Sequence, residues 1–200
     1  MIRRPLLPAA ALVATLTLAA CNSSPEAGRP DTTPTTATSS PSPTAPSAPT
    51  YTPEEQAAIT AAKARYIAAR AAVDKAFEDP AQFDRNALEK AGNGGQWMIE
   101  LAGGAQQLQD YGWYRSGTSK ISTTRVISVK LDLEQPEVRL TNCIDSSGVV
   151  TRFKKDDKPV PMGPGNGKRH KFSSQLVYAA PSGGNSKIWF LIADKAAGPC

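Results

Sequence analysis

Side chains suited to acid–base or metal chemistry are scarce in this sequence of 200 residues. Its one histidine, His170, lies in the basic run Lys168-Arg169-His170-Lys171. Neighbouring cations lower the basicity of an imidazole and repel metal ions, so we expect an exposed histidine at the entrance to a strand. The motifs H-E-x-x-H, G-x-S-x-G and S-x-x-K, typical of zinc proteases, α/β-hydrolases and penicillin-binding enzymes, do not occur. We therefore assign no catalytic residue, metal site or cofactor.

The first of the three cysteines, Cys21, carries the clearest chemical signal. It follows Arg3, Arg4 and an apolar stretch from Leu6 to Ala20, which is the pattern of an export signal. That stretch is shorter than the roughly 20 residues that a membrane-spanning helix requires. In Leu18-Ala19-Ala20-Cys21 the sequence resembles the lipobox of bacterial lipoproteins. The resemblance implies cleavage before Cys21 and attachment of a diacylglyceryl group to its sulfur.

Export and lipidation together determine where we expect the protein to be. Several acyl chains give stable anchoring, so we expect a lipid-anchored protein on the extracytoplasmic face of a bacterial cell membrane. That compartment is oxidising, and with Cys21 taken by lipid, Cys143 and Cys200 remain to form a disulfide. Such a bond would stabilise the fold by about 4 kcal/mol in the chain-entropy model. It would also hold the C-terminus, which otherwise frays.

Composition divides the chain into three parts. Residues 1–20 form the expected signal peptide, and residues 21–50 hold the lipidated cysteine and a linker rich in Pro, Ser and Thr. The linker lacks apolar periodicity and cannot bury enough surface to offset the entropy of ordering. It would reach on the order of 90 Å if extended and on the order of 30 Å as a coil. Residues 51–200 form a single domain of ordinary size.

The charge balance argues against nucleic acid as a partner. The formal net charge of +5 comes from 23 basic and 18 acidic residues. Removing the leader with Arg3 and Arg4 leaves 21 basic residues and a charge of +3. This excess is too small to indicate nucleic-acid binding.

Helical signals come first along the domain. Thr52-Pro53-Glu54-Glu55 combines an N-cap hydroxyl, a proline at the first helical position and a reciprocal glutamate, so a helix begins here and ends at Asp79-Pro80. Its apolar stripe contains Ile59, Ala62, Tyr66, Ala69, Val73 and Phe77. A short helix is expected from about Asp84 to Ala91, ended by Gly92. A third, weakened by Gly103-Gly104, carries Trp97, Leu101, Leu108 and Tyr111.

Strand signals follow Gly117, where apolar residues begin to alternate. Ile127, Val129, Leu131 and Leu133 share one face of a predicted strand. A four-residue loop over 134–137 would pair Leu133 with Val138, which places Asn142 opposite Val129 on the apolar face and Cys143 on the other. Further strands are expected over about 149–155, 171–180 and 187–194. The last strand is apolar on both faces, through Trp189 and Leu191, which predicts a central position in the sheet.

Helices followed by a meandering antiparallel sheet predict an α+β domain with helices, one of them long, packed on a curved sheet. The order of elements, the strand ending Leu140-Thr141-Asn142-Cys143-Ile144-Asp145 and the lipobox resemble actinobacterial lipoproteins of the nuclear transport factor 2-like class, over about Thr52 to Cys200. The resemblance implies a cone in which a long helix closes the sheet, and some members of the class bind small molecules or catalyse reactions inside it. An alanine-dominated stripe without an acidic–histidine pair departs from the enzymes of the class.

A possible pocket in such a cone is formed by Tyr66, Asn142 and Tyr178. The amide of Asn142, on an apolar face, needs a partner, which can be a ligand, water or a helix side chain. We expect a non-enzymatic cell-envelope lipoprotein that binds a small apolar ligand or another envelope protein. Two alternatives stay open: an isomerase- or cyclase-type enzyme using the cone cavity, and a structural protein-interaction module with a filled core. An open cavity between Tyr66 and Asn142 would separate these hypotheses.

Overall fold

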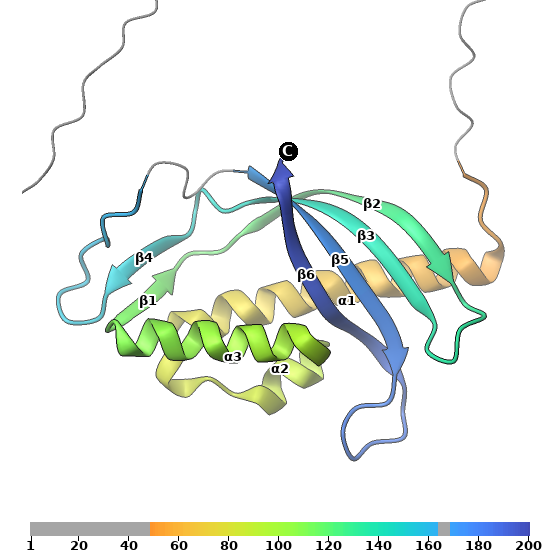
Figure 1. Ribbon diagram of the computed structural model, residues 1–200, viewed down its shortest axis with the longest axis horizontal. Helices are drawn as coiled ribbons and strands as arrows, with labels where there is room; N and C mark the ends of the chain where they lie inside the picture. Colours follow the sequence, from red (N-terminus) through yellow and green to blue (C-terminus); the bar gives the residue numbers. More distant parts are fainter. Residues whose placement is uncertain (1–48, 164–168) are drawn as a thin grey trace, which may run out of the picture. The chain divides into compact units, whose positions relative to one another are not determined.

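The computed structural model of the protein describes residues 49–163 and 169–200 (Figure 1). The signal peptide expected over residues 1–20, the lipidation expected at Cys21 and nearly all of the linker lie outside this part. Within it, no helix combines the length and the apolar character needed to cross a bilayer.

The helices begin and end at the predicted signals. Helix α1 (Pro53–Glu78) starts with the full capping box: the Thr52 hydroxyl accepts a hydrogen bond from the Glu55 backbone N–H (3.2 Å), and the Glu55 carboxylate accepts one from the Thr52 N–H (2.9 Å). A 3-10 turn, η1 (Pro80–Gln82), leads to α2 (Arg85–Ala91). Helix α2 ends at Gly92, whose φ of 100° favours glycine. Helix α3 (Gly95–Asp110) is continuous through its two central glycines.

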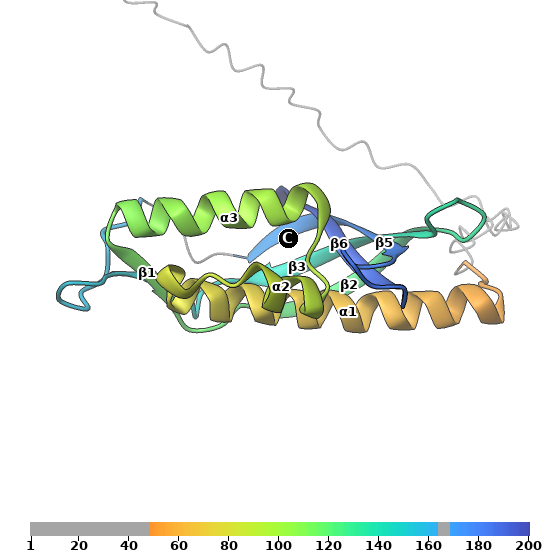
Figure 2. The same ribbon diagram turned by 90° about the horizontal axis from the view of Figure 1, so that it is seen from below.

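The strands form two antiparallel sheets. A small sheet pairs β1 (Trp113–Ser116) with β4 (Val150–Phe153). The larger sheet has the order β2-β3-β5-β6, formed by β2 (Lys120–Lys130), β3 (Glu137–Asp145), β5 (Arg169–Ala179) and β6 (Ile188–Pro199). Its strands curve over α1, and α3 lies beside α1 (Figures 1 and 2). The predicted α+β class, with one long helix packed on a curved antiparallel sheet, is confirmed.

The predicted stripe of α1 forms the core. All six of its members are buried: Ile59, Ala62, Tyr66, Ala69, Val73 and Phe77. Its central part packs against the concave face of the sheet, through Val138, Leu140, Ile144, Leu176 and Leu191. Alanines at the contact let the helix approach the sheet closely, because they add little volume between the two backbones. The C-terminal part of α1 packs instead on α2 and α3, through Leu88, Met98, Leu101, Ala105 and Leu108.

The pairing of β2 with β3 differs from the prediction by four residues at Val138 and by five at Asn142. Val129, not Leu133, lies opposite Val138, and Asn142 lies opposite Thr124. The loop between the strands is therefore longer than expected. A register shift between Val126 and Ser128 leaves Ile127 62% exposed rather than on the apolar face. The faces of β3 depend on alternation within β3 itself, so Asn142 still lies on the apolar face and Cys143 on the other.

Strand β6 lies at an edge of the sheet, not at its centre. Its outer edge is covered by backbone at the start of α3: the Leu191 N–H donates to the Gly92 carbonyl (2.7 Å), and the Gly94 N–H donates to the Leu191 carbonyl (3.0 Å). The same segment packs against the face opposite Leu191, where a Cβ added at Gly94 would lie 3.1 Å from the Phe190 side chain, so this edge strand is apolar on both faces. Its register with β5 pairs Tyr178 with Trp189.

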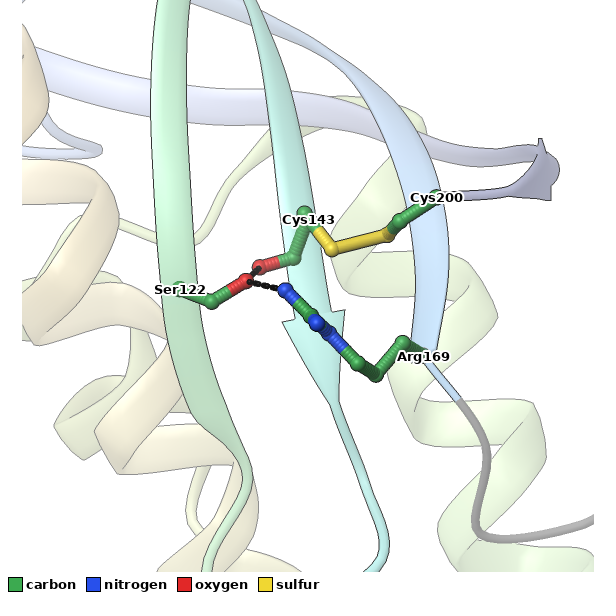
Figure 3. The surroundings of a disulfide bond; sticks show 4 residues. All are labelled: Ser122, Cys143, Arg169 and Cys200. Carbon is green, nitrogen blue, oxygen red and sulfur yellow. Dashed lines mark hydrogen bonds between the residues drawn. A yellow bond between two sulfur atoms is a disulfide. The ribbon is translucent and has the colours of Figure 1, made fainter.

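The expected disulfide joins Cys143 of β3 to Cys200, directly after β6 (Figure 3). Asn142 and Ile144, the two neighbours of Cys143 in β3, have side chains that are fully buried on the concave face. Cys143 therefore lies on the opposite face of the strand. The Ser122 hydroxyl donates to the Cys143 carbonyl (3.1 Å) and accepts from Arg169 Nη2 (3.1 Å) beside the bond. The last residue of the chain is therefore held to a central strand.

Candidate functional site

A buried carboxylate, that of Asp194 on β6, is the centre of a polar network inside the fold. Asp194 is 4% exposed and accepts hydrogen bonds from Ser174 Oγ (2.6 Å) and Arg70 Nη1 (3.1 Å). The Tyr66 hydroxyl lies 3.4 and 3.5 Å from its two carboxylate oxygens. Burying an unpaired charge is costly, so the ion pair with Arg70 is what allows an acidic residue here.

Burial shifts the pKa of two groups in this network. It raises the pKa of Asp194, while the charge of Arg70 and the hydrogen bonds from Ser174, Tyr66 and Arg70 oppose the shift. It also raises the pKa of Tyr66, as does the nearby charge of Asp194. The tyrosine therefore keeps its proton at neutral pH and serves as a donor to the carboxylate.

The network reaches Asn142 through Ser174. Asn142 Nδ2 donates to Ser174 Oγ (2.7 Å). Ser174 has a single hydroxyl proton, which it donates to Asp194. Its oxygen must therefore accept from Asn142, and this determines which end of the Asn142 amide faces Ser174. The partner expected for Asn142 is thus a serine of the neighbouring strand β5. Asn142 Oδ1 and Arg70 Nε are buried without a partner among the described residues.

The pocket expected from Tyr66, Asn142 and Tyr178 is not formed. Tyr66 and Asn142 lie in one network, but both are 0% exposed, because the core side chains around them leave no room for a ligand. Tyr178 is 37% exposed and packs on Trp189, with ring centroids 5.4 Å apart. The three residues therefore do not share a ligand-sized space.

An open pocket lies between α1 and the small sheet, next to the buried network. Its volume is about 400 Å³. It is lined by polar and charged side chains, together with the aliphatic residues of β4 and the segment after it: Arg70, Asp74, Arg115, Ser119, Ser146, Val149, Val150, Thr151, Val160, Met162 and His170. Arg70 belongs to both features, because its side chain, 12% exposed, reaches from the buried Asp194 to the pocket wall.

Arg115 gives this pocket its charge. It lies on β1 opposite Thr151, and its guanidinium lies over the Phe77 ring, 4.9 Å from the centroid. Partial removal from water, followed by repulsion from Arg70, lowers the pKa of Arg115, yet a guanidinium remains charged at neutral pH. Among the described residues, it makes no hydrogen bond and no ion pair within 4.0 Å. Its donors are therefore available to a ligand.

Asp74 is the acidic residue of the pocket, and its carboxylate is already occupied. Asp74 Oδ2 accepts from the Ser119 backbone N–H (2.8 Å) and from Ser119 Oγ (2.7 Å). These bonds tie α1 to the start of β2. The acidic group of the pocket is thus engaged within the protein, whereas, among the described residues, the guanidinium of Arg115 is not.

A second, apolar groove contains Tyr178. It lies between the first turns of α1 and the ends of the two hairpins, with a volume of about 550 Å³. Its lining combines small and aliphatic residues with two cations: Ala57, Ala58, Ala61, Arg65, Leu131, Pro136, Tyr178, Lys187, Ile188 and Trp189. Of the three pocket residues expected from the sequence, Tyr178 alone lines a groove described here.

Three residues of the site were not expected from the sequence. A signal existed for Arg70, which follows Tyr66 by one helical turn and so lies beside the buried stripe. A signal existed for Asp194, an acidic residue at the end of a strand that is otherwise apolar. No signal in the sequence indicated Arg115, because β1 is short and no pattern of neighbouring residues predicts its pairing with β4. His170, expected to be exposed, is half-buried at the start of β5 and lines the pocket.

Comparison with known proteins assigns no function to this site. Neither a known protein family nor a curated protein sequence matches the chain. Among solved structures, it is similar to the intermembrane space region of the chloroplast protein ARC6, with 10% identity and a TM-score of 0.45, over 72% of this chain and 96% of that one. At this level the likeness bears on neither ligand nor activity.

Proposed function

We propose that this domain binds a small anionic molecule in the pocket between α1 and the β1–β4 sheet. The observation that carries the proposal is the Arg115 guanidinium, which faces an open pocket of about 400 Å³ without a protein partner in the described part of the chain. A carboxylate or phosphate matches the donor geometry of a guanidinium and gains a charge-assisted hydrogen bond. Arg70 also lines the pocket, but Asp194 balances its charge, so Arg115 supplies the positive charge that a ligand would meet.

We place this binding activity at the outer surface of a bacterial cell membrane, with the protein held by lipid on Cys21. The lipobox-like sequence before Cys21 supports this assignment. The Cys143–Cys200 disulfide is consistent with it, because such bonds persist in oxidising compartments. The likeness to nuclear transport factor 2-like lipoproteins remains part of the proposal. We infer a binding protein rather than an isomerase or cyclase, since Tyr66 and Asn142 are inaccessible to a substrate.

Calorimetric titration of the domain with acetate, succinate and inorganic phosphate tests the anion site. We expect binding that weakens at least tenfold in Arg115→Gln, which removes the charge but keeps a polar side chain of similar reach. Arg125→Gln is the matched control, because Arg125 is an exposed arginine on β2 outside the pocket. Equal affinities of wild type and Arg115→Gln for every anion would overturn the proposal.

A small apolar molecule is a second candidate ligand, favoured by the lining of the Tyr178 groove. Tyr178, Ile188 and Leu131 supply the kind of surface that most small-molecule sites offer. A neutral fluorescent probe such as N-phenyl-1-naphthylamine should bind there and lose several-fold affinity in Tyr178→Ser. Arg115→Gln should leave its binding unchanged. Probe binding that is insensitive to Tyr178→Ser would exclude the groove as its site.

A further inference from the structure

A smaller cavity adjoins the Arg115 pocket on the other side of a thin wall. Its volume is about 260 Å³, and it is lined by Ile67, Arg70, Ala71, Asp74, Thr118, Ser119 and Ile121. Arg70, Asp74 and Ser119 line both spaces. The two cavities are therefore neighbours that share one row of side chains.

The two sides of this wall differ in chemistry. The Arg115 side carries the guanidinium groups and His170. The other side is made largely of aliphatic groups from Ile67, Ala71 and Ile121. Ile67 is 55% exposed, so an alkyl chain lying against it would remove apolar surface from water.

The charged groups of this wall already have partners within the protein, which lowers the cost of covering them with an alkyl chain. Its acidic group, Asp74, is engaged by two hydrogen bonds from Ser119, at 2.8 and 2.7 Å. Arg70 is paired with the buried Asp194 at 3.1 Å, so its charge is already balanced inside the protein. An anionic head group therefore has the guanidinium of Arg115 as its partner, and aliphatic surface lies beyond the shared row.

We propose that the ligand of the Arg115 pocket is an anionic amphiphile, with its head group at Arg115 and a single alkyl chain lying across the Arg70–Asp74 wall onto Ile67. The inference rests on the proposed anion site and adds the class of ligand that the site takes. A fatty carboxylate and a monoalkyl phosphate share the required chemistry, namely one anionic head and one apolar chain. Each methylene that leaves water strengthens binding, by up to roughly fourfold when fully buried.

Chain-length dependence of affinity tests the proposal. Calorimetry with acetate, hexanoate, decanoate and decyl phosphate, below their micellar concentrations, should show affinity rising with chain length. Because the cavity is open on one side, we expect about half of the full effect, or roughly tenfold between hexanoate and decanoate. A clear preference between decanoate and decyl phosphate would identify the head group. Decanol, which has the chain without the charge, should bind at least tenfold more weakly than decanoate.

Two variants assign the chain and the head to their sites. Ile67→Gln should weaken decanoate several-fold and leave acetate unchanged, while Arg115→Gln should weaken both. The matched control is Ile99→Gln, because Ile99 is 59% exposed on α3 and lines neither cavity. Glutamine suits a helix interior, and unchanged thermal unfolding would show that both variants are folded.

The results of these experiments distinguish failure of the amphiphile inference from failure of the anion site on which it rests. Acetate binding that depends on Arg115, with no gain from longer chains, overturns the amphiphile and leaves the anion site standing. Failure of every anion to bind overturns both. Decanol binding as tightly as decanoate, or equal effects of Ile67→Gln and Ile99→Gln, also overturns the inference. A chain-length gain that is lost in Ile67→Gln alone supports it.

Discussion

Ser174 and Asp194 illustrate how a buried carboxylate orders the side chains around it. Asp194 accepts from Ser174, Ser174 in turn accepts from Asn142, and Tyr66 keeps its proton beside the carboxylate. Once the Asp194 carboxylate is in position, each hydrogen-bond donor of this network has one acceptor left to which it can donate. The network therefore behaves as one unit whose members have defined roles.

The sequence predicted some of these residues and not others, for physical reasons. The positions of Tyr66 and Asn142 follow from local periodicity, which places them on apolar faces whatever the rest of the chain does. The pairing of Arg70 with Asp194 joins residues 124 positions apart and depends on the packing of α1 against the sheet. An arginine beside a helix stripe is ordinarily solvated, so its sequence context alone indicates no partner.

Glu137 provides a pH-dependent prediction at the same scale. Glu137 is 7% exposed and accepts from Arg139 Nε (2.6 Å) and from Gln175 Nε2. The hydrogen bond from Arg139 lowers the pKa of Glu137, so the carboxylate stabilises the fold above its ordinary pKa of 4.5 and loses this effect as pH falls through the folded-state pKa. Arg139 is half-exposed, and water screening limits the contribution to about 1 kcal/mol.

We therefore expect Glu137→Gln to be less stable than wild type at pH 7 by about 1 kcal/mol, and the difference to shrink below pH 4. Urea unfolding at several pH values measures this. Glu134→Gln, in the exposed hairpin loop, is the control and should leave stability unchanged at every pH. A Glu137→Gln difference that is constant between pH 3 and pH 7 would contradict the assignment.

At the scale of elements, helices could be predicted better than strands. The beginnings of α1 and α2 and the end of α2 follow from residues directly beside them, namely Thr52, Asp84 and Gly92. Strand pairing depends on partners far along the chain, and an alternating pattern indicates the face of a strand without indicating its register. The register error between β2 and β3, four residues at Val138 and five at Asn142, arises from this difference. Ile127 fits the alternating pattern of the sequence, yet it lies at an irregular position of β2 and its side chain is exposed.

The central glycines of α3 give a prediction about helix stability. Gly103 is exposed, and a Cβ added there would have no neighbour within 4 Å, while a Cβ at Gly104 would lie 3.3 Å from Phe77 Cζ. We expect Gly103→Ala to raise the free energy of unfolding by about 0.5–1 kcal/mol, because alanine costs less backbone entropy in a helix. Gly104→Ala should gain less, since Phe77 must shift. Urea unfolding of both variants measures the two effects, and an equal gain would contradict the packing at Phe77.

For the whole molecule, the anchor proposed at Cys21 can be tested by fractionation of cells. Cys21→Ala removes the sulfur that would carry the lipid, so the protein should leave the membrane fraction or accumulate as an unprocessed precursor. Cys200→Ser is the control, because it removes a cysteine of the disulfide instead and should leave membrane attachment unchanged. A Cys21→Ala protein that stays in the membrane fraction in its processed form would sink the proposed location.

The two edges of the larger sheet have opposite consequences for association between copies of the protein. Backbone from residues 92–94 occupies the outer edge of β6 at Leu191, so a second chain cannot pair with that part of the strand without displacing it. Strand β2 forms the other edge, and its two register irregularities interrupt the straight row of backbone groups that another strand would need. If many copies are crowded on one membrane, this construction discourages them from joining edge to edge into a continuous sheet. The protection against edge-to-edge pairing is then built into the backbone rather than into the surface charge.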